Sequence, residues 1–254
     1  MPTAVLLSGG LDSAVLVADE AAAQPDVQPV YVKAGLAWEA AELTMVVRFL
    51  AAARFRHPIR PLVSLGVDMR DVYAATHWAI EGRPPGYHTP DEDVYLPGRN
   101  VILLGKAGVY CAAAGVDRIV VGTLGHNPFP DATPDFRAAM ARALSLGLAH
   151  PLQIEAPYAA MSKADVIRRG AAHGVPFELT LSCMNPQAPR TDRVQPPRTD
   201  RVQPPRTNHP QSPIPNPQPP LHCGECSKCR ERHDAFVEAG VPDPTTYATT
   251  INLS

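Results

Sequence analysis

A pair of glycines near the N-terminus constrains the fold of this chain more than any other feature. It separates an apolar run at residues 3–7 from a helix-like run that begins near Asp12 and ends at Ala23. Glycines allow a tight turn, so that successive backbone N–H groups and the N-terminus of the next helix can face one anion. The sequence therefore predicts a strand, a helix and, between them, a phosphate-binding loop made of Leu7, Ser8, Gly9, Gly10, Leu11, Asp12 and Ser13.

This loop differs from the common phosphate-binding motifs. A Walker A loop ends in Gly-Lys-Ser or Gly-Lys-Thr, whereas the nearest Gly-Lys here, Gly105-Lys106, is followed by Ala107. The loop does not match the dinucleotide-binding fingerprint either. The alternative interpretation is a glycine turn in which Asp12 caps the helix.

Apolar runs and helix-like runs alternate along the chain. We expect strands at residues 29–32, 59–63 and 118–122, and helices at residues 12–23, 39–55, 101–114, 136–146 and 230–238. Such alternation predicts an α/β fold built on a doubly wound parallel sheet with helices on both faces. Ligands of such folds bind at the carboxyl ends of the strands, where the glycine pair stands.

The charge balance and the hydropathy argue against several classes of partner. The chain has 23 Lys and Arg residues and 25 Asp and Glu residues, and its net charge of -2 gives no general attraction to nucleic acid or to an anionic membrane. No apolar stretch reaches the roughly 18 residues of a membrane helix, and the N-terminus has no signal-peptide pattern. We expect a soluble cytoplasmic protein with no nucleic-acid partner and no membrane partner.

Two long loops are expected at the carboxyl ends of strands, where loops often carry function. The first, residues 81–100, ends in Arg99 and Asn100. The planar guanidinium of Arg99 either clamps a phosphate or carboxylate group or lies on the surface. Asn100 is expected to cap the helix that follows.

The second loop, residues 122–136, is the expected substrate wall. Its carboxylates, Asp131 and Asp135, are suited to hold magnesium or to recognise the edge of a base. Asp135 is equally suited to cap the next helix. His126 is a candidate only because it lies in this loop.

Ser162 and Lys163 stand at the start of another expected helix. Ser162 is a suitable N-cap. Lys163 lies near the positive end of the helix dipole, where a cation is unfavourable. A phosphate contact therefore explains Lys163 better than helix stability does, and a solvated lysine is the alternative.

Four of the five cysteines form a metal-ligand pattern, made of Cys183, Cys223, Cys226 and Cys229. Soft thiolate ligands at Cys-X2-Cys-X2-Cys spacing favour tetrahedral zinc, and four protein ligands leave no open position, which makes the site structural. An iron–sulfur cluster is one alternative, and His233 in place of one cysteine is another. The fifth cysteine, Cys111, lies among apolar residues and is predicted to be a core residue.

A tandem eight-residue repeat interrupts the cysteine pattern. Thr191–Arg198 is repeated at Thr199–Arg206 and is followed by further prolines. With so few apolar residues this segment cannot offset its ordering entropy, so we predict disorder with extended polyproline conformers. A partner-binding polyproline ligand is the alternative to a local duplication.

These features in combination resemble one enzyme family. The resemblance is carried by residues 8–13, Pro97-Gly98-Arg99-Asn100, Phe129-Pro130-Asp131, Lys163 and the four cysteines. In this combination the chain is similar to the 7-cyano-7-deazaguanine synthase family of queuosine biosynthesis, within the PP-loop ATP pyrophosphatase superfamily. The resemblance implies ATP-dependent conversion of 7-carboxy-7-deazaguanine and ammonia to the nitrile, through an adenylated carboxylate, an amide and a second activation.

The same resemblance implies cofactors and residue roles. ATP would be accompanied by Mg2+, and the four cysteines would hold Zn2+. Lys163 and Arg99 would offset phosphate charge, and Asp12 would orient the loop or the metal. Asp131 would face the substrate.

We expect three parts in the chain. A PP-loop ATP-binding α/β domain is expected at residues 1–180. A small helical zinc-binding region is expected at residues 181–240, interrupted by the disordered insertion at about residues 186–220, and a tail at residues 241–254. A homodimer is possible.

Two stretches depart from the family's pattern. The family's Gln-X-His-X-X-Glu stretch is Gly-Leu-Ala-Trp-Glu-Ala-Ala-Glu at residues 35–42 here, which lacks the basic recognition residues. The family's Tyr-Pro-Asp-Cys-Arg becomes Phe-Pro-Asp-Ala-Thr at residues 129–133, which lacks the cysteine and the arginine. Two alternatives therefore stay open: a paralogue that adenylates a different carboxylate, and a nucleotide-binding scaffold that acts through the proline-rich insertion.

Overall fold

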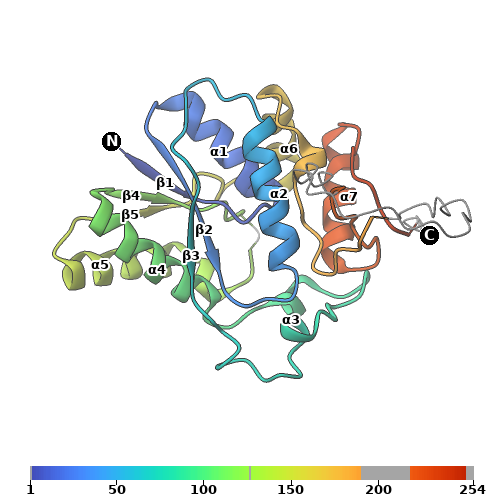
Figure 1. Cartoon of the computed structure of the whole chain (residues 1–254), viewed down its shortest axis with the longest axis horizontal. Coiled ribbons are helices and arrows are strands. Elements are labelled where there is room, and N and C mark those ends of the chain that lie inside the picture. The colour runs from blue at the N-terminus through green and yellow to red at the C-terminus, as the bar shows by residue number, and fades with distance from the viewer. Residues whose placement is uncertain (1, 126, 190–217, 250–254) are drawn as a thin grey trace, which may run out of the picture.

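Strand β1 (Thr3–Leu6), which precedes the glycine pair, lies at the centre of a parallel sheet (Figure 1). The computed structural model describes residues 2–125, 127–189 and 218–249. Its five parallel strands are arranged in the order β3-β2-β1-β4-β5. The other four strands are β2 (Val27–Lys33), β3 (Val63–Gly66), β4 (Arg118–Val120) and β5 (Gln153–Glu155). Ala4 of β1 pairs with Gln28 on one side and Ile119 on the other, so β1 holds both halves of the sheet together.

Helices cover both faces of the sheet (Figure 1). On one face lie α1 (Leu11–Ala23), α2 (Glu39–Ala52) and α6 (Lys163–Ala172), and on the other lie α4 (Arg99–Ala114) and α5 (Pro134–Leu148). The first group packs through a buried cluster that includes Val15, Phe49 and Ile167, and the second through Leu104 and Cys111. The prediction of a doubly wound parallel sheet is therefore confirmed.

Two further helices, a short one and a longer one, complete the described part of the fold. They are α3 (Trp78–Glu81) and α7 (Ser227–Ala239), and three 3-10 turns lie at Asp91–Val94, Pro130–Ala132 and Phe177–Leu179. Helix α7 packs against α6. A third buried cluster includes Leu36 and Trp38, which follow β2, together with the four cysteines of the predicted metal pattern.

The strand expected at residues 59–63 is wrong in position. Strand β3 begins at Val63 and pairs with residues 30–33 of β2. Pro58 and Pro61 lie before it, and a proline has no N–H group to donate to a sheet ladder. The ladder therefore starts only after Pro61. Strand β5 is three residues long and was not expected, because Gln153 and Glu155 interrupt its apolar pattern.

A buried arginine fixes α7 to the segment that precedes the cysteines. Arg232 is 1% exposed, and its guanidinium donates to the carbonyl oxygen of Phe177 at 2.8 Å and to the hydroxyl of Thr180 at 2.8 Å. A third contact, at 2.7 Å, goes to the hydroxyl of Thr245. A buried charge is tolerated only when its donors are hydrogen-bonded. Residues 241–249, assigned to a tail on sequence, thus help to hold α7 in place.

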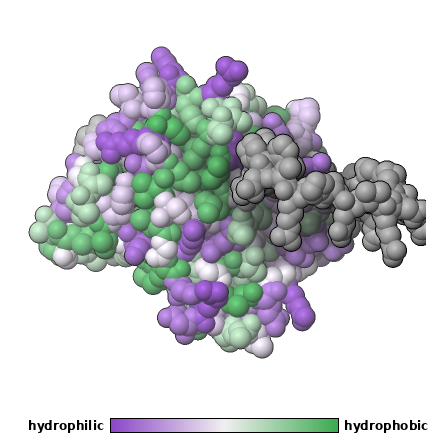
Figure 2. Space-filling model, viewed as in Figure 1, coloured by the Kyte–Doolittle hydropathy of each residue, from purple (hydrophilic) through white to green (hydrophobic). Residues whose placement is uncertain are grey.

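Strand β3 forms one edge of the sheet in the described part of the chain. Apolar side chains gather over the middle of the face seen in Figure 2, where Figure 1 shows β2, β3 and α2. An apolar surface beside an unpaired sheet edge is typical of contact with another chain.

Three features lie outside the described residues: His126, the proline-rich repeat at residues 191–206 and the last five residues. The prediction of disorder for the repeat therefore stays a prediction. Among the described helices, none combines the length and the apolar character needed to cross a bilayer.

Candidate active site

The glycine pair forms a tight turn between β1 and α1. Gly9 has a φ of 80°, and a Cβ at this position would lie 2.9 Å from the Cγ2 atom of Val46. No other residue type fits this turn without strain. The hydroxyl of Ser13 donates to the carbonyl oxygen of Gly10 at 3.0 Å and accepts from the N–H of Ser8 at 3.2 Å. Gly10 is the N-cap of α1 and contributes no side chain, so the helix N-terminus stays open.

A cavity of about 480 Å³ opens in front of this turn. Ser8, Gly10 and Asp12 line it from the turn, and Gly122 lines it from the loop after β4. A Cβ on Gly122 would lie 3.3 Å from the backbone of Asp12 and Ser13, which is a tight contact, so glycine favours the close approach of this loop to the start of α1. The volume is in the range of small-molecule sites, and the position is the usual ligand site of a doubly wound sheet.

Four charged side chains meet at one end of the cavity. The ammonium of Lys163 lies 3.2 Å from Oδ2 of Asp12 and 2.6 Å from Oε1 of Glu231. The ammonium of Lys228 lies 2.6 Å from Oε2 of the same Glu231. Three separate elements, α1, α6 and α7, supply this cluster, which we call the phosphate-end cluster.

Lys163 and Glu231 stabilise each other's charged form. Burial lowers the pKa of Lys163, but Asp12 and Glu231 outweigh burial and raise it above its ordinary value. Burial raises the pKa of Glu231, but Lys163 and Lys228 lower it to about 2. Lys163 is therefore positive and Glu231 negative at neutral pH.

The sequence identified two members of this cluster and missed the other two. Asp12 and Lys163 were expected to act at the phosphate end, and the structure brings them together. Lys228 lies within the cysteine motif and Glu231 lies just after it. The sequence indicated only that both belong to a zinc-binding region. Their spacing at i and i+3 on a helix is the one local signal that they act as a pair.

Aromatic side chains also line the cavity. The rings of Trp38 and Trp78 stack with centroids 5.7 Å apart and planes 7° apart. Phe129, on the opposite loop, stacks on Tyr95 with centroids 5.0 Å apart. Trp38, Trp78 and Phe129 all line the cavity. Such walls are suited to a planar ring.

A buried carboxylate holds Trp38 in place. The indole N–H of Trp38 donates to Oε1 of Glu42 at 3.0 Å, and the hydroxyl of Tyr31 donates to Oε2 at 3.0 Å. Burial raises the pKa of Glu42 to about 7, although Arg99 and the two hydrogen bonds act in the opposite direction. Trp38 stands in one of the two stretches that depart from the family's pattern, and Glu42 ends that stretch.

Arg99 faces the cavity from the start of α4. Its Nε atom is buried and has no hydrogen-bond partner among the described residues. A buried guanidinium N–H without a partner is costly unless a ligand accepts from it. Arg99 therefore faces the cavity with a donor available to an anionic group, and its role toward a phosphate or carboxylate stays a prediction.

Asp131 is placed differently from its expected role. The carboxylate accepts from the backbone N–H of Asn100 at 3.0 Å and from the side-chain amide of Asn100 at 3.3 Å, and Asp131 is not among the residues that line the cavity. It therefore binds the first turn of α4 and does not face the cavity. The expectation that Asn100 caps this helix is also wrong, because Gly98 is the N-cap.

Two helix caps are settled by the structure. Helix α5 is capped by Thr133, whose hydroxyl accepts from the N–H of Phe136 at 3.2 Å, and not by Asp135. Helix α6 is capped by Ser162 as predicted, with Asp165 completing a capping box.

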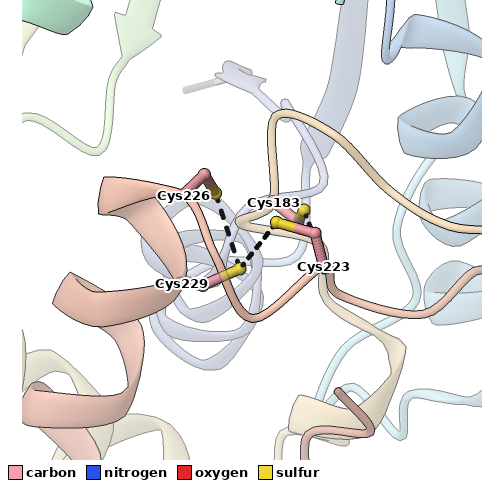
Figure 3. A group of neighbouring side chains, drawn as sticks. All are labelled: Cys183, Cys223, Cys226 and Cys229. Atoms are coloured by element: carbon pink, nitrogen blue, oxygen red, sulfur yellow. Dashed lines mark hydrogen bonds between the residues drawn. The ribbon is translucent and has the colours of Figure 1, made fainter. Parts of the chain in front are cut away.

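The four cysteines of the predicted metal pattern converge on one point (Figure 3). Their sulfur atoms all lie within 4.8 Å of one another, and the group found among the described residues does not include His233. The Sγ atom of Cys229 lies 3.8 Å from that of Cys223 and 3.5 Å from that of Cys226. Sulfurs bound to tetrahedral zinc at about 2.3 Å lie about 3.8 Å apart. The cluster is therefore compatible with zinc.

Backbone N–H groups support the sulfur cluster. The N–H groups of Asn185 and Cys223 donate to Sγ of Cys183 at 3.3 and 3.2 Å. Such donors favour the thiolate form that binds metal. Cys111, by contrast, is 0% exposed within the core, and burial raises its pKa to about 12. The prediction that Cys111 is a core residue is confirmed.

Comparison with known proteins connects the cavity and the cysteines to one family. The family model described as Queuosine biosynthesis protein QueC matches residues 3–240 of the chain. The 7-cyano-7-deazaguanine synthase of Anaeromyxobacter dehalogenans (strain 2CP-C) is 31% identical over 257 residues, which cover 96% of this chain and 94% of the relative. Those of Azoarcus sp. (strain BH72) and Dechloromonas aromatica (strain RCB) are each 32% identical and cover 96% of this chain, and 95% and 96% of the respective relatives. The matched range includes the glycine turn and all four clustered cysteines.

The cysteine cluster predicts a metal content that can be measured. We expect one zinc ion per chain by mass spectrometry of the metals, and we expect Cys229→Ser to lose it. Because a structural zinc site supplies about 10 kcal/mol or more of folding free energy, the variant should melt at least roughly 10 °C lower. The control Cys111→Ala changes the core and should keep the zinc. Iron with sulfide in the wild-type protein, or zinc retained by Cys229→Ser, would contradict the assignment.

Glu42 predicts a pH dependence of stability. Its pKa is about 7 in the folded protein, against 4.5 as its ordinary value, so the unfolded state releases the proton first as pH rises. The stability that protonated Glu42 contributes is present below pH 4.5 and is lost as the pH rises through about 7. Glu42→Gln cannot ionise, so between pH 4.5 and pH 8 the unfolding free energy should shift in favour of the variant by about 3 kcal/mol.

Urea denaturation of both proteins at several pH values measures this shift. Glu178→Gln, at an exposed position, is the matched control and should give a pH-independent difference from the wild type. An equally flat difference for Glu42→Gln would show that Glu42 does not titrate as described.

Proposed function

The chain belongs to the QueC family of queuosine biosynthesis proteins, and from this premise we propose that it uses ATP to convert 7-carboxy-7-deazaguanine and ammonia to 7-cyano-7-deazaguanine. The relatives described above carry the name of that synthase. The observation that carries the proposal is the lining of the cavity. It combines a glycine turn and lysines, suited to phosphate, with stacked aromatic rings, suited to a planar base.

The glycine turn is the proposed site of the departing pyrophosphate. The substrate's carboxylate oxygen attacks the α-phosphorus of ATP, the bond to the β-phosphate oxygen breaks, and pyrophosphate leaves. The N–H groups of the turn and of the open N-terminus of α1 donate hydrogen bonds to this anion. Lys163 and Arg99 offset the phosphate charge, and both line the cavity.

The acyl adenylate makes AMP the leaving group. Ammonia attacks the activated carbonyl, AMP departs, and the amide forms. A second ATP activates the amide oxygen in the same way and releases pyrophosphate, and loss of AMP and of both amide protons then gives the nitrile. The chain therefore acts as a carbon–nitrogen ligase that uses two ATP for each nitrile.

Asp12 is suited to hold the magnesium ion that accompanies ATP. Its Oδ1 atom is buried and has no hydrogen-bond partner among the described residues. Carboxylate and phosphate oxygens are the ligands that magnesium prefers. The metal would supply charge neutralisation at the phosphates, while Lys163 stays 3.2 Å from the other carboxylate oxygen.

The zinc has a structural role in this proposal. Four thiolates fill a tetrahedral shell, which leaves no position for a reacting water. Asp131 retains only an indirect role, because it fixes the first turn of the helix that presents Arg99. The expected cytoplasmic location, the possible homodimer and the absence of a nucleic-acid partner are also part of the proposal.

The test is a product assay with purified, zinc-loaded protein. We expect MgATP, ammonium and 7-carboxy-7-deazaguanine to yield the amide, the nitrile and two AMP per nitrile by mass spectrometry. Asp12→Asn should slow AMP formation by roughly 100-fold, in line with the loss of one preorganised charge at a reacting phosphate. Asp71→Asn, at an exposed position, is the matched control and should match the wild type.

Two other outcomes would change the proposal. AMP formed only with another planar carboxylate would identify a paralogue, and the two departures at residues 35–42 and 129–133 make this the second candidate. No AMP with any carboxylate would contradict adenylation itself.

A further inference from the structure

Glu231 contacts both lysines of the phosphate-end cluster. Its two carboxylate oxygens are divided between them: Oε1 lies 2.6 Å from Lys163, and Oε2 lies 2.6 Å from Lys228. All three side chains are largely buried, with 15% of Lys163, 24% of Glu231 and 25% of Lys228 exposed. The carboxylate therefore holds two ammonium groups, one at each of its oxygen atoms.

The carboxylate of Glu231 is positioned by helix α7, which begins at the cysteine cluster. Cys226 is the N-cap of the helix and Cys229 lies in its first turn, so both sulfurs belong to the end of α7 that carries Lys228 and Glu231 (Figure 3). Arg232, next to Glu231, is buried and is bonded to Phe177 and Thr180 on a neighbouring segment. Glu231 therefore lies between two anchored residues, Cys229 before it and Arg232 after it.

A carboxylate at this place is unfavourable for binding an anion directly. ATP brings several negative charges to the same end of the cavity, and Glu231 repels them in an environment of low dielectric constant. Glu231 does not cap a helix N-terminus, and it lies near the start of α7 without bonding to the N-cap. Glu231 contacts the two lysines, so we expect it to act by positioning their ammonium groups.

We propose that Glu231 is a positioning residue that holds the ammonium groups of Lys163 and Lys228 at the phosphate end of the cavity, so that the nucleotide site depends on the cysteine cluster through α7. The proposal rests on the function proposed above, because it takes the cavity to bind ATP. It assigns Lys228 as a second phosphate-binding cation and gives the zinc region a part in nucleotide handling.

The test distinguishes two effects of Glu231: it positions the ammonium of Lys163, and its negative charge repels the nucleotide. In Glu231→Gln a negative charge leaves the cavity, so a non-hydrolysable ATP analogue should bind about threefold more tightly by calorimetry. Lys163 at the same time loses one of its two anionic partners, so kcat for AMP formation should fall roughly tenfold. A merely structural role would lower the melting temperature without moving affinity and kcat in opposite directions.

Asp234→Asn is the matched control, because it removes one carboxylate at an exposed position of the same helix. It should leave kcat, the affinity for the analogue and the zinc content at wild-type values. Lys228→Met is the second variant, which keeps the test decisive where Glu231→Gln folds poorly. It should weaken binding of the analogue at least threefold.

Each result decides between the proposals. Opposite changes in affinity and kcat for Glu231→Gln, with zinc retained, support the inference, as does weaker binding by Lys228→Met. If the wild-type protein is active and Glu231→Gln has the same kcat and analogue affinity as Asp234→Asn, the inference is overturned and the proposed function stays intact. A wild-type protein that neither binds the analogue nor forms AMP overturns the proposed function, and this inference with it.

Discussion

The carbonyl oxygen of Gly9 accepts a hydrogen bond from the backbone N–H of Leu181 at 2.7 Å, and the rest of the site depends on this contact. It joins the glycine turn to the segment that carries Cys183, two residues further on. Gly9 has a positive φ, and there is no space for a Cβ beside Val46. A turn near the N-terminus and a cysteine cluster near the C-terminus are thereby held in one arrangement.

The cysteine cluster and the cavity act as one unit because α7 belongs to both. The helix starts at the sulfur cluster, and one turn later it presents Glu231 to Lys163 on α6. Lys163 in turn contacts Asp12 at the start of α1. The charge at the phosphate end therefore comes from three helices, and only α1 directly follows the glycine turn in sequence. A zinc site with no open position can influence catalysis by fixing such a helix.

Features carried by short sequence motifs were predictable from the sequence. The glycine turn, the cysteine cluster, the cap at Ser162 and the doubly wound sheet are all specified by neighbouring residues or by a repeating pattern. The position of β3 was not, because the prolines before it shift the start of the ladder by four residues relative to the expected strand. The role of Asp131 was not predictable either, since its partner Asn100 lies 31 residues away. Glu231 was not predictable because its partner Lys163 comes from a different helix, and Lys228 reaches the cluster only through Glu231.

The most direct test is a crystal structure of the zinc-loaded chain with magnesium and a non-hydrolysable ATP analogue. The triphosphate is expected on the N–H groups of Gly9 and Gly10, at about 3 Å, with the ammonium of Lys163 beside it. The base is expected in the same cavity. A triphosphate bound elsewhere, with the glycine turn left empty, would contradict the assignment of this cavity as the nucleotide site.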